Sequence, residues 1–379
     1  MASTGDTEKL RRAAAQMLMV GFHEAPSVVP DSVREALEDG LGGVILFRRN
    51  IKSMDQFMSL SRSIHQAPPQ NEPGPFLAVD QEGGRVVRLR DPLTPIPPMR
   101  EVGDRGDPAW THEVSAMMAR ELKAVGVNLN FAPVVDVDTN PDNPVIGDRS
   151  FSRDPREVAQ HGRAFVAGHL ENGVLPCAKH FPGHGDTHVD SHLALPSLPH
   201  DLARLERVEL HPFVELFKAD LPLLMTAHIL FEELDASHPA TLSQSILQGL
   251  LRKKLSYQGL VISDCLEMQA VSQRYTIEEM VELGLEAGID IFLICHTESL
   301  WQRAWKHLVY LGQKSQEKRD TILSIAERIR ALKRQHIVDP AFDKDGLATL
   351  GCPEHRAIFS IVDKEATSTA QTDPTEPTN

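Results

Sequence analysis

Residues 154–180, DPREVAQHGRAFVAGHLENGVLPCAKH, contain one unit of the pattern that decides the fold. The unit opens with Asp154, a candidate helix cap, and places Pro155 at the first helical position. The helical stretch closes near Gly173, a residue type that commonly ends helices. The apolar run at 175–180 has the length and composition of a strand buried on both faces. This segment therefore predicts a helix followed directly by a buried strand.

The same unit recurs along the chain. Further strands are predicted at 16–22, 43–47, 76–80, 128–133, 223–228, 260–264 and 289–295, with helices at 107–126, 201–220 and 276–288. The last of these helices begins with the capping-box pair Thr276 and Glu279. Eight strands that alternate with helices predict a single-domain α/β fold, the (β/α)8 TIM barrel, with a doubly wound open sheet as the alternative.

The end of the chain has a different composition from the barrel. Two helical stretches at 298–311 and 316–335 are expected to pack on the barrel and close its end. We therefore assign residues 8–340 to the barrel with its closing helices, and 341–379 to a C-terminal extension. From about residue 364 the sequence KEATSTAQTDPTEPTN is polar and has no aliphatic run, so we predict disorder there.

Charge and composition exclude several classes of protein. The chain of 379 residues has 53 acidic and 39 basic side chains, a net charge of −14. This balance argues against nucleic acid or an anionic membrane as the main partner, because both require a basic face. The polar start and the absence of an apolar run of about 18 residues predict a soluble, cytoplasmic protein. The four cysteines are far apart and are expected to be free thiols: Cys177, Cys265, Cys295 and Cys352.

Charged or histidine side chains follow six of the predicted strands. In a TIM barrel, catalytic groups lie at the C-terminal ends of the strands, so these residues predict a polar pocket. A plainer explanation is that polar residues simply mark where strands stop. The residues concerned are Asp80, Asp136, Asp138, Lys179, His180, His228, Asp264 and His296.

The loop after the fifth strand, KHFPGHGDTHVDSH at 179–192, carries a histidine at every fourth position. On a helix the four histidines would share one face and could bind a metal, which makes a metal-dependent hydrolase one alternative. Pro182, Gly183 and Gly185 disfavour a helix there, so we interpret the spacing as accidental. No metal is therefore predicted.

Two carboxylates have candidate chemical roles. Asp190 and His192 are two residues apart, so in extended backbone they point the same way and can form a general acid/base pair. The alternative is a solvated pair on a loop. Asp264 ends a buried strand and can serve as a nucleophile at an anomeric carbon or, alternatively, as a helix cap.

Five segments together resemble a known family. LAVDQEGGRVVRL, NFAPVVDV, IGDRSF, AKHFPGHGDTHVDSH and VISDCLEM are similar to glycoside hydrolase family 3, more narrowly to its single-domain β-N-acetylglucosaminidases of the NagZ type. The resemblance covers about residues 10–335, with the motifs in the same order. It implies a retaining enzyme that releases terminal β-linked N-acetylglucosamine through a covalent glycosyl-enzyme, without a metal or organic cofactor.

The resemblance also implies a role for each matching residue. Asp264 corresponds to the nucleophile, His192 to the acid/base and Asp190 to its partner. The expected substrate-binding residues are Asp80, Arg88, Arg149, Lys179 and His180. Cys265 departs from the family pattern, which usually has a second Asp there, and this puts selectivity near the leaving group in question.

The expected partner is a small-molecule or oligosaccharide substrate. A β-glucosidase or a glycoside phosphorylase of the same family remains an alternative, and a non-catalytic sugar-binding barrel is another.

Overall fold

Eight parallel strands form a ring in the computed structural model, which describes residues 4–69, 72–191, 193–337, 342, 344–359 and 373–375. Their order is β11-β9-β7-β6-β3-β2-β1-β12, and a parallel bridge between Ile262 and Ile291 brings the two ends together. The strands are β1 (Leu18–Val20), β2 (Gly43–Ile45), β3 (Phe76–Val79), β6 (Leu129–Asn130), β7 (Leu175–Phe181), β9 (Leu223–Thr226), β11 (Leu260–Ile262) and β12 (Phe292–Ile294).

Each predicted strand therefore coincides with a strand of the ring, and the TIM barrel is confirmed. An open doubly wound sheet would leave two unpaired edges, which this nearly closed ring does not have. Two small sheets lie outside the barrel. One pairs β4 (Gln81–Gly83) with β5 (Val86–Val87), and the other pairs β8 (Ser197–Leu198) with β10 (Leu230–Phe231).

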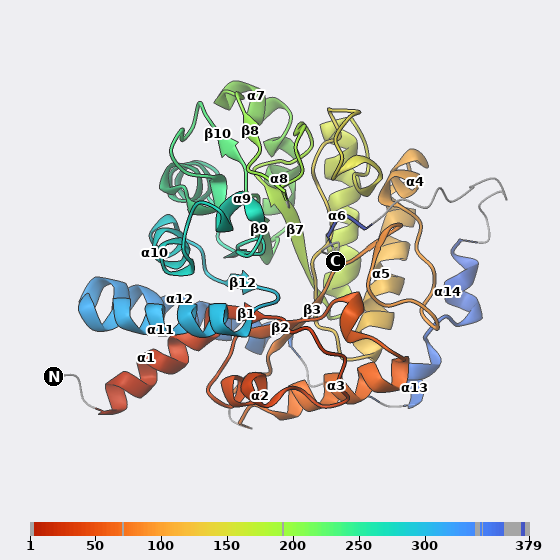
Figure 1. Cartoon of the computed structure of the whole chain (residues 1–379). Coiled ribbons are helices and arrows are strands. Elements are labelled where there is room, and N and C mark those ends of the chain that lie inside the picture. Colours follow the sequence, from red (N-terminus) through yellow and green to blue (C-terminus); the bar gives the residue numbers. More distant parts are fainter. Residues whose placement is uncertain are drawn as a thin grey trace.

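Helices surround the barrel (Figure 1). The α-helices are α1 (Thr4–Gln16), α2 (Asp31–Glu38), α3 (Met54–Gln66), α4 (Met99–Asp104), α5 (Pro108–Ala124), α6 (Pro155–Glu171), α7 (Leu202–Arg207), α8 (Leu210–Phe217), α9 (Gln269–Ser272), α10 (Ile277–Ala287), α11 (Glu298–Lys314), α12 (Gln316–His336), α13 (Lys344–Ala348) and α14 (Pro353–Ala357). Short 3-10 segments are η1 (Arg48–Asn50), η2 (Gly147–Arg149) and η3 (Ala240–Leu242), and η4 (Ser245–Lys254) is a π-helix.

The predicted helix starts are confirmed by their caps. Asp154 accepts a hydrogen bond from the backbone N–H of Arg156 at 2.7 Å, so it satisfies a donor that α6 leaves unpaired. Thr276 and Glu279 form the capping box of α10, and Gly288 ends that helix with a φ of 107°. A positive φ of this size strains any residue with a Cβ, which is why glycine occupies the position.

One predicted helix, at 201–220, is divided into α7 and α8. Pro212 has no backbone N–H and cannot bond to the carbonyl of Val208, so a continuous helix would lose a hydrogen bond at this point. The sequence pattern of apolar residues continues across the break, which is why it predicted a single helix.

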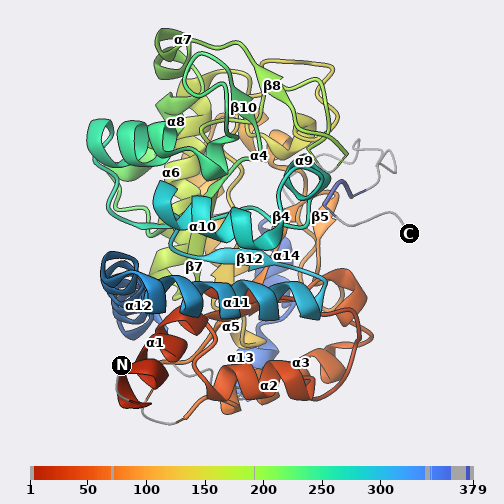
Figure 2. The same cartoon turned by 60° about the vertical axis from the view of Figure 1, so that its left-hand side comes forward.

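The last two long helices pack beside the N-terminal helix. Figures 1 and 2 show α11 and α12 lying together with α1 on one side of the molecule. The Nζ of Lys333 on α12 donates to the carbonyl of Gly42 at 2.6 Å and to the Oε1 of Gln16 at 3.0 Å. Gly42 and Gln16 precede β2 and β1, so α12 meets the barrel at the N-terminal ends of its strands, away from the ends expected to carry the pocket.

Helices α13 and α14 belong to the expected C-terminal extension, and α13 packs against α5. Most of the segment predicted to be disordered lies outside the described residues. The exception is 373–375, which lies over the barrel near β5 (Figure 2). The described helices include none with the length and apolar character that a bilayer crossing requires.

Candidate active site

A cavity of about 450 Å³ opens at the C-terminal ends of the barrel strands. Its apolar lining includes Phe47, Phe131 and Met225. Most of the residues expected from the sequence to bind or transform substrate line this one cavity, although they come from distant parts of the chain: Asp80, Arg149, Lys179, His180, Asp190 and Asp264. The strand-end pattern therefore predicted a real polar pocket.

Asp264 follows β11 and is half-buried at the cavity wall. Its Oδ1 accepts a hydrogen bond from the backbone N–H of Cys265 at 2.7 Å, which fixes the orientation of the carboxylate. Cys265 is buried, and a hydrogen bond from the thiol of Cys295 lowers its pKa below the usual value.

The loop after β7 reaches the cavity through Asp190 and Ser191, while His192 lies outside the described residues. Ser191 is held in place by His184, because its Oγ lies 3.0 Å from the Nε2 of that ring. The Nδ1 of His184 in turn lies 2.9 Å from the Oγ1 of Thr187. The positions that flank residue 192 thus lie at the pocket, and the proposed role of His192 stays a prediction.

Asp80, Arg88 and Lys179 form a buried charged cluster. The two oxygens of Asp80 accept from Lys179 Nζ at 2.8 Å and from Arg88 at 3.0 Å. Burial would raise the pKa of Asp80, but the charges of Lys179 and Arg88 outweigh it and hold that pKa below its usual value. Arg88 is fully buried. It therefore acts on the site through its hydrogen bond to Asp80 and through the other groups that contact its guanidinium.

Glu82 is a member of this cluster that the sequence did not single out. It accepts from Arg149 through both oxygens at 2.8 Å, and Lys179 lies 2.6 Å from its Oε1. Burial opposes ionisation, yet Arg149 and Lys179 lower the pKa of Glu82 far below its usual range. Lys179 is thereby held between two carboxylates. The motif DQEGGR contains Glu82, but nothing in its spacing indicates these partners.

Asp136 holds two histidines that line the pocket and was also not assigned a role from the sequence. It accepts from the Nδ1 of His180 at 2.7 Å and from the backbone N–H of His184 at 2.7 Å. Burial, followed by the nearby His180, lowers the pKa of His184 to about 4, so this ring is neutral at physiological pH. His184 is a rigid support for the loop and does not act as a proton donor near neutrality.

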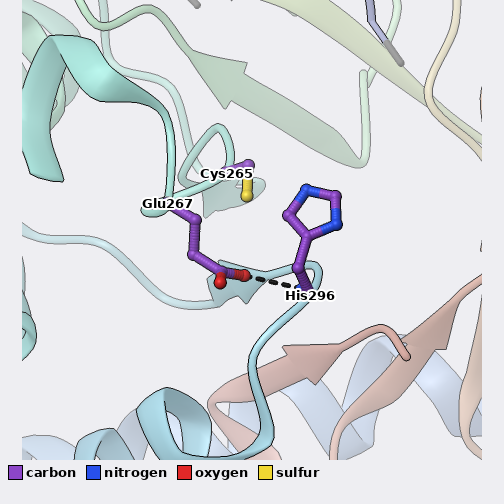
Figure 3. Close-up of side chains that lie close together, drawn as sticks. All are labelled: Cys265, Glu267 and His296. Carbon is purple, nitrogen blue, oxygen red and sulfur yellow. Dashed lines mark hydrogen bonds between the residues drawn. The ribbon is translucent and has the colours of Figure 1, made fainter. Parts of the chain in front are cut away.

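The described loop histidines are engaged with protein groups and do not converge on one point. His180 bonds Asp136, His184 bonds Ser191 and Thr187, and the Nδ1 of His188 lies 3.1 Å from the Nδ2 of Asn140. Within the described ranges, the histidine, cysteine and acidic side chains that do come together as a group of three are Cys265, Glu267 and His296, at the cavity wall (Figure 3).

The described part of the C-terminal segment enters the cavity. Asp373, Pro374 and Thr375 contribute to its lining. The carboxylate of Asp373 forms an ion pair with Arg88, and the side chain of Thr375 contacts the same guanidinium. This segment occupies the place where the sequence predicts that Arg88 meets a substrate hydroxyl.

Comparison with known proteins identifies the family of this chain. The model of the glycosyl hydrolase family 3 N-terminal domain matches residues 9–332. The chain belongs to glycoside hydrolase family 3. It is therefore an enzyme of a class that cleaves glycosidic bonds, and its expected substrate is a carbohydrate. The resemblance inferred from the five sequence segments is confirmed at the level of the family.

Curated relatives of this family member include two bacterial proteins. The chain is 35% identical over 360 residues to beta-hexosaminidase A of Pseudoalteromonas piscicida. The aligned region covers 88% of this chain but only 60% of that protein. It is 37% identical over 313 residues to the beta-hexosaminidase of Methylococcus capsulatus. This second alignment covers 78% of this chain and 91% of that protein.

The solved structures that resemble it include a glycoside hydrolase family 3 beta-N-acetylglucosaminidase from a Paenibacillus species. This protein is 37% identical, superposes with a TM-score of 0.80, and the match covers 90% of this chain and 67% of that chain. The fold and the family therefore agree between sequence and structural comparisons.

Proposed function

We propose that this enzyme hydrolyses terminal β-linked N-acetylglucosamine with retention of configuration, using Asp264 as nucleophile and His192 as acid/base. The observation that carries the proposal is the shared cavity. Asp264 follows β11, Asp190 lies on the loop after β7, and both line the same polar pocket. The beta-hexosaminidases and the beta-N-acetylglucosaminidase described above support the choice of sugar.

Asp264 is suited to the nucleophilic role by its position. It is half-buried at the mouth of the barrel, and the hydrogen bond from Cys265 N–H holds one of its oxygens. A carboxylate fixed in this way can attack an anomeric carbon without a large reorganisation. In a retaining glycosidase the attack forms a covalent ester and displaces the leaving group.

His192 would supply and recover the proton. In the first step the protonated imidazole donates to the oxygen of the leaving group while Asp264 forms the bond to carbon. In the second step the neutral imidazole removes a proton from water, and the water oxygen displaces Asp264 from the anomeric carbon. Asp190, two residues away, would hold the ring and favour its cationic form.

We expect the buried charged cluster around Asp80 to bind the sugar. Asp80 faces the cavity with its charge maintained by Lys179 and Arg88, and a carboxylate of this kind accepts hydrogen bonds from sugar hydroxyls. Arg149 and Lys179 supply donors at the same wall, and His180 completes it. Their positions are held by Glu82 and Asp136, so the pocket is organised before the substrate arrives.

The decisive experiment measures hydrolysis of an aryl β-N-acetylglucosaminide by Asp264→Asn. The amide is nearly the same shape but cannot form the ester, so kcat should fall at least about a thousandfold. NMR of the first product formed by the wild-type enzyme should show the β anomer. Wild-type turnover in Asp264→Asn, or an α anomer as first product, would contradict the proposal.

The acid/base role of His192 has its own test. His192→Ala should slow substrates with poor leaving groups more than aryl substrates with good ones, because activated phenols need little protonation. Equal losses on both would indicate a structural role instead.

The same assay separates the alternatives. An aryl β-glucoside tests the β-glucosidase alternative, and EDTA tests the metal-dependent hydrolase. Product analysis at high phosphate tests the phosphorylase, since a neutral base would not repel phosphate. We expect the N-acetylglucosaminide to be the better substrate, and we expect EDTA not to lower the rate.

A further inference from the structure

Cys265, Glu267 and His296 converge at the wall of the cavity (Figure 3). One potential ligand atom from each side chain lies within 4.8 Å of the other two. Cys265 and Glu267 belong to the loop that follows β11, whereas His296 follows β12. The two loops are neighbours because β11 and β12 are the strands that close the barrel.

These three groups are a ligand set for a zinc-like cation. Thiolate, imidazole and carboxylate are the side chains that bind Zn²⁺, whereas Mg²⁺ and Ca²⁺ prefer oxygen ligands alone. Zinc bonds of about 2.0–2.3 Å place tetrahedral ligands roughly 3.4–3.8 Å apart. The three ligand atoms are therefore at most about one ångström farther apart than in a loaded site, a difference that small side-chain rotations can close.

The surroundings hold the three side chains near each other. Glu267 accepts from the backbone N–H of His296 at 2.6 Å and from that of Thr297 at 3.0 Å, which ties the two loops together. A carboxylate has about four lone-pair positions, so these bonds leave capacity for a cation. The ring of His296 lies against Phe47, with ring centroids 5.7 Å apart.

Cys265 supplies the soft ligand of the cluster, a thiolate, which favours thiophilic metal ions. It stands where the resemblance to the family leads one to expect an aspartate, so a sulfur ligand replaces an oxygen ligand at this position. We propose that Cys265, Glu267 and His296 form a binding site for a thiophilic divalent cation such as Zn²⁺, with water at the fourth position. Because Asp264 and Cys265 both line the cavity, the bound cation lies in the same cavity as the carboxylate and inhibits the enzyme.

The primary test is direct binding to the whole chain after treatment with a chelator. Titration with Cd²⁺ should produce an ultraviolet thiolate-to-metal absorption band that saturates at one cation per chain, and calorimetry with Zn²⁺ should give the same stoichiometry. Cys265→Ser should abolish the band. His296→Ala should weaken Zn²⁺ binding by at least about a hundredfold, since even indirect supporting groups account for 10–100-fold.

Cys352→Ser is the matched control, because this thiol lies outside the cluster at the start of α14. It should retain the band and the affinity. A Cys265→Ser protein that keeps the band, or a Cys352→Ser protein that loses it, would overturn the proposal.

A second measurement uses only the wild-type chain and so does not depend on how the variants fold. Zn²⁺ should slow alkylation of Cys265, read by peptide mass spectrometry, and leave the rate at Cys352 unchanged. Equal rates at Cys265 with and without Zn²⁺ would count against the site. Neither measurement relies on glycosidase activity, so failure of the proposed function would leave both results intact. Inhibition by Zn²⁺ that EDTA reverses is the additional result expected if both proposals hold.

Discussion

Replacement of Glu82 by glutamine removes one charge from the buried cluster and changes little else. Glutamine has the same shape, so packing is preserved. Lys179 keeps Asp80 as a partner at 2.8 Å, but Arg149 loses its bidentate carboxylate and retains the carbonyl of Val145 at 3.2 Å. The side chains of Glu82 and Arg149 are each 2% exposed, so water cannot replace the lost partner.

This burial determines the size of the effect. Removal of one partner from a buried ion pair costs about 3–5 kcal/mol, because the remaining charge is left without compensation. A matched pair on the surface has the same bidentate geometry: Arg303 donates to Glu278 at 2.8 and 2.7 Å, with side chains 49% and 33% exposed. Glu278→Gln should cost no more than about 1 kcal/mol.

Urea unfolding followed by circular dichroism measures both variants. The double variant Glu82→Gln with Arg149→Met should be more stable than Glu82→Gln alone, because the orphaned cation has been removed as well. If Glu82→Gln destabilises the protein no more than Glu278→Gln does, the reasoning about the buried cluster is wrong.

The difference in stability between wild type and Glu82→Gln should depend on pH. The folded-state pKa of Glu82 lies below its ordinary value of 4.5, so its ionised form stabilises the fold fully above pH 4.5. That contribution is lost as pH falls from 4.5 toward the depressed folded-state value. The difference in the free energy of unfolding between wild type and Glu82→Gln should therefore shrink on acidification. A difference that grows below pH 4.5 would contradict this sign.

Three further outcomes are expected. Asp373→Ala removes the ion pair with Arg88. The KM for an aryl N-acetylglucosaminide should then fall by up to about tenfold, the equivalent of about 1.4 kcal/mol, while kcat stays the same. An unchanged KM would show that residues 373–375 do not compete with substrate. Burial lowers the pKa of Lys333 to about 7, so between pH 7 and 10 the stability of wild type should rise relative to Lys333→Met, as urea unfolding would show. Gly185→Ala would place its Cβ 1.7 Å from the carbonyl oxygen of Val137, so the loop must move and kcat should drop, whereas unchanged kinetics would mean that the loop position is not required.

Local signals in the sequence were sufficient for the architecture. The apolar runs located every strand of the ring, and the caps at Asp154 and Thr276 located two helix starts, because burial and capping depend on residues close together in the chain. The pattern failed at 201–220, where apolar periodicity continued through a break that Pro212 imposes. The assignment of 8–340 and 341–379 to a barrel and an extension remains a prediction.

The sequence by itself determined that this chain is an α/β barrel with polar groups at the ends of its strands, since alternation and strand length carry that information. Only the tertiary structure decided which of those groups are partners. Glu82 meets Lys179, Asp136 meets His180, and Cys265 meets His296 because ring closure and strand register bring separate loops together. Those distances depend on the curvature of the whole sheet, which no local pattern of residues encodes.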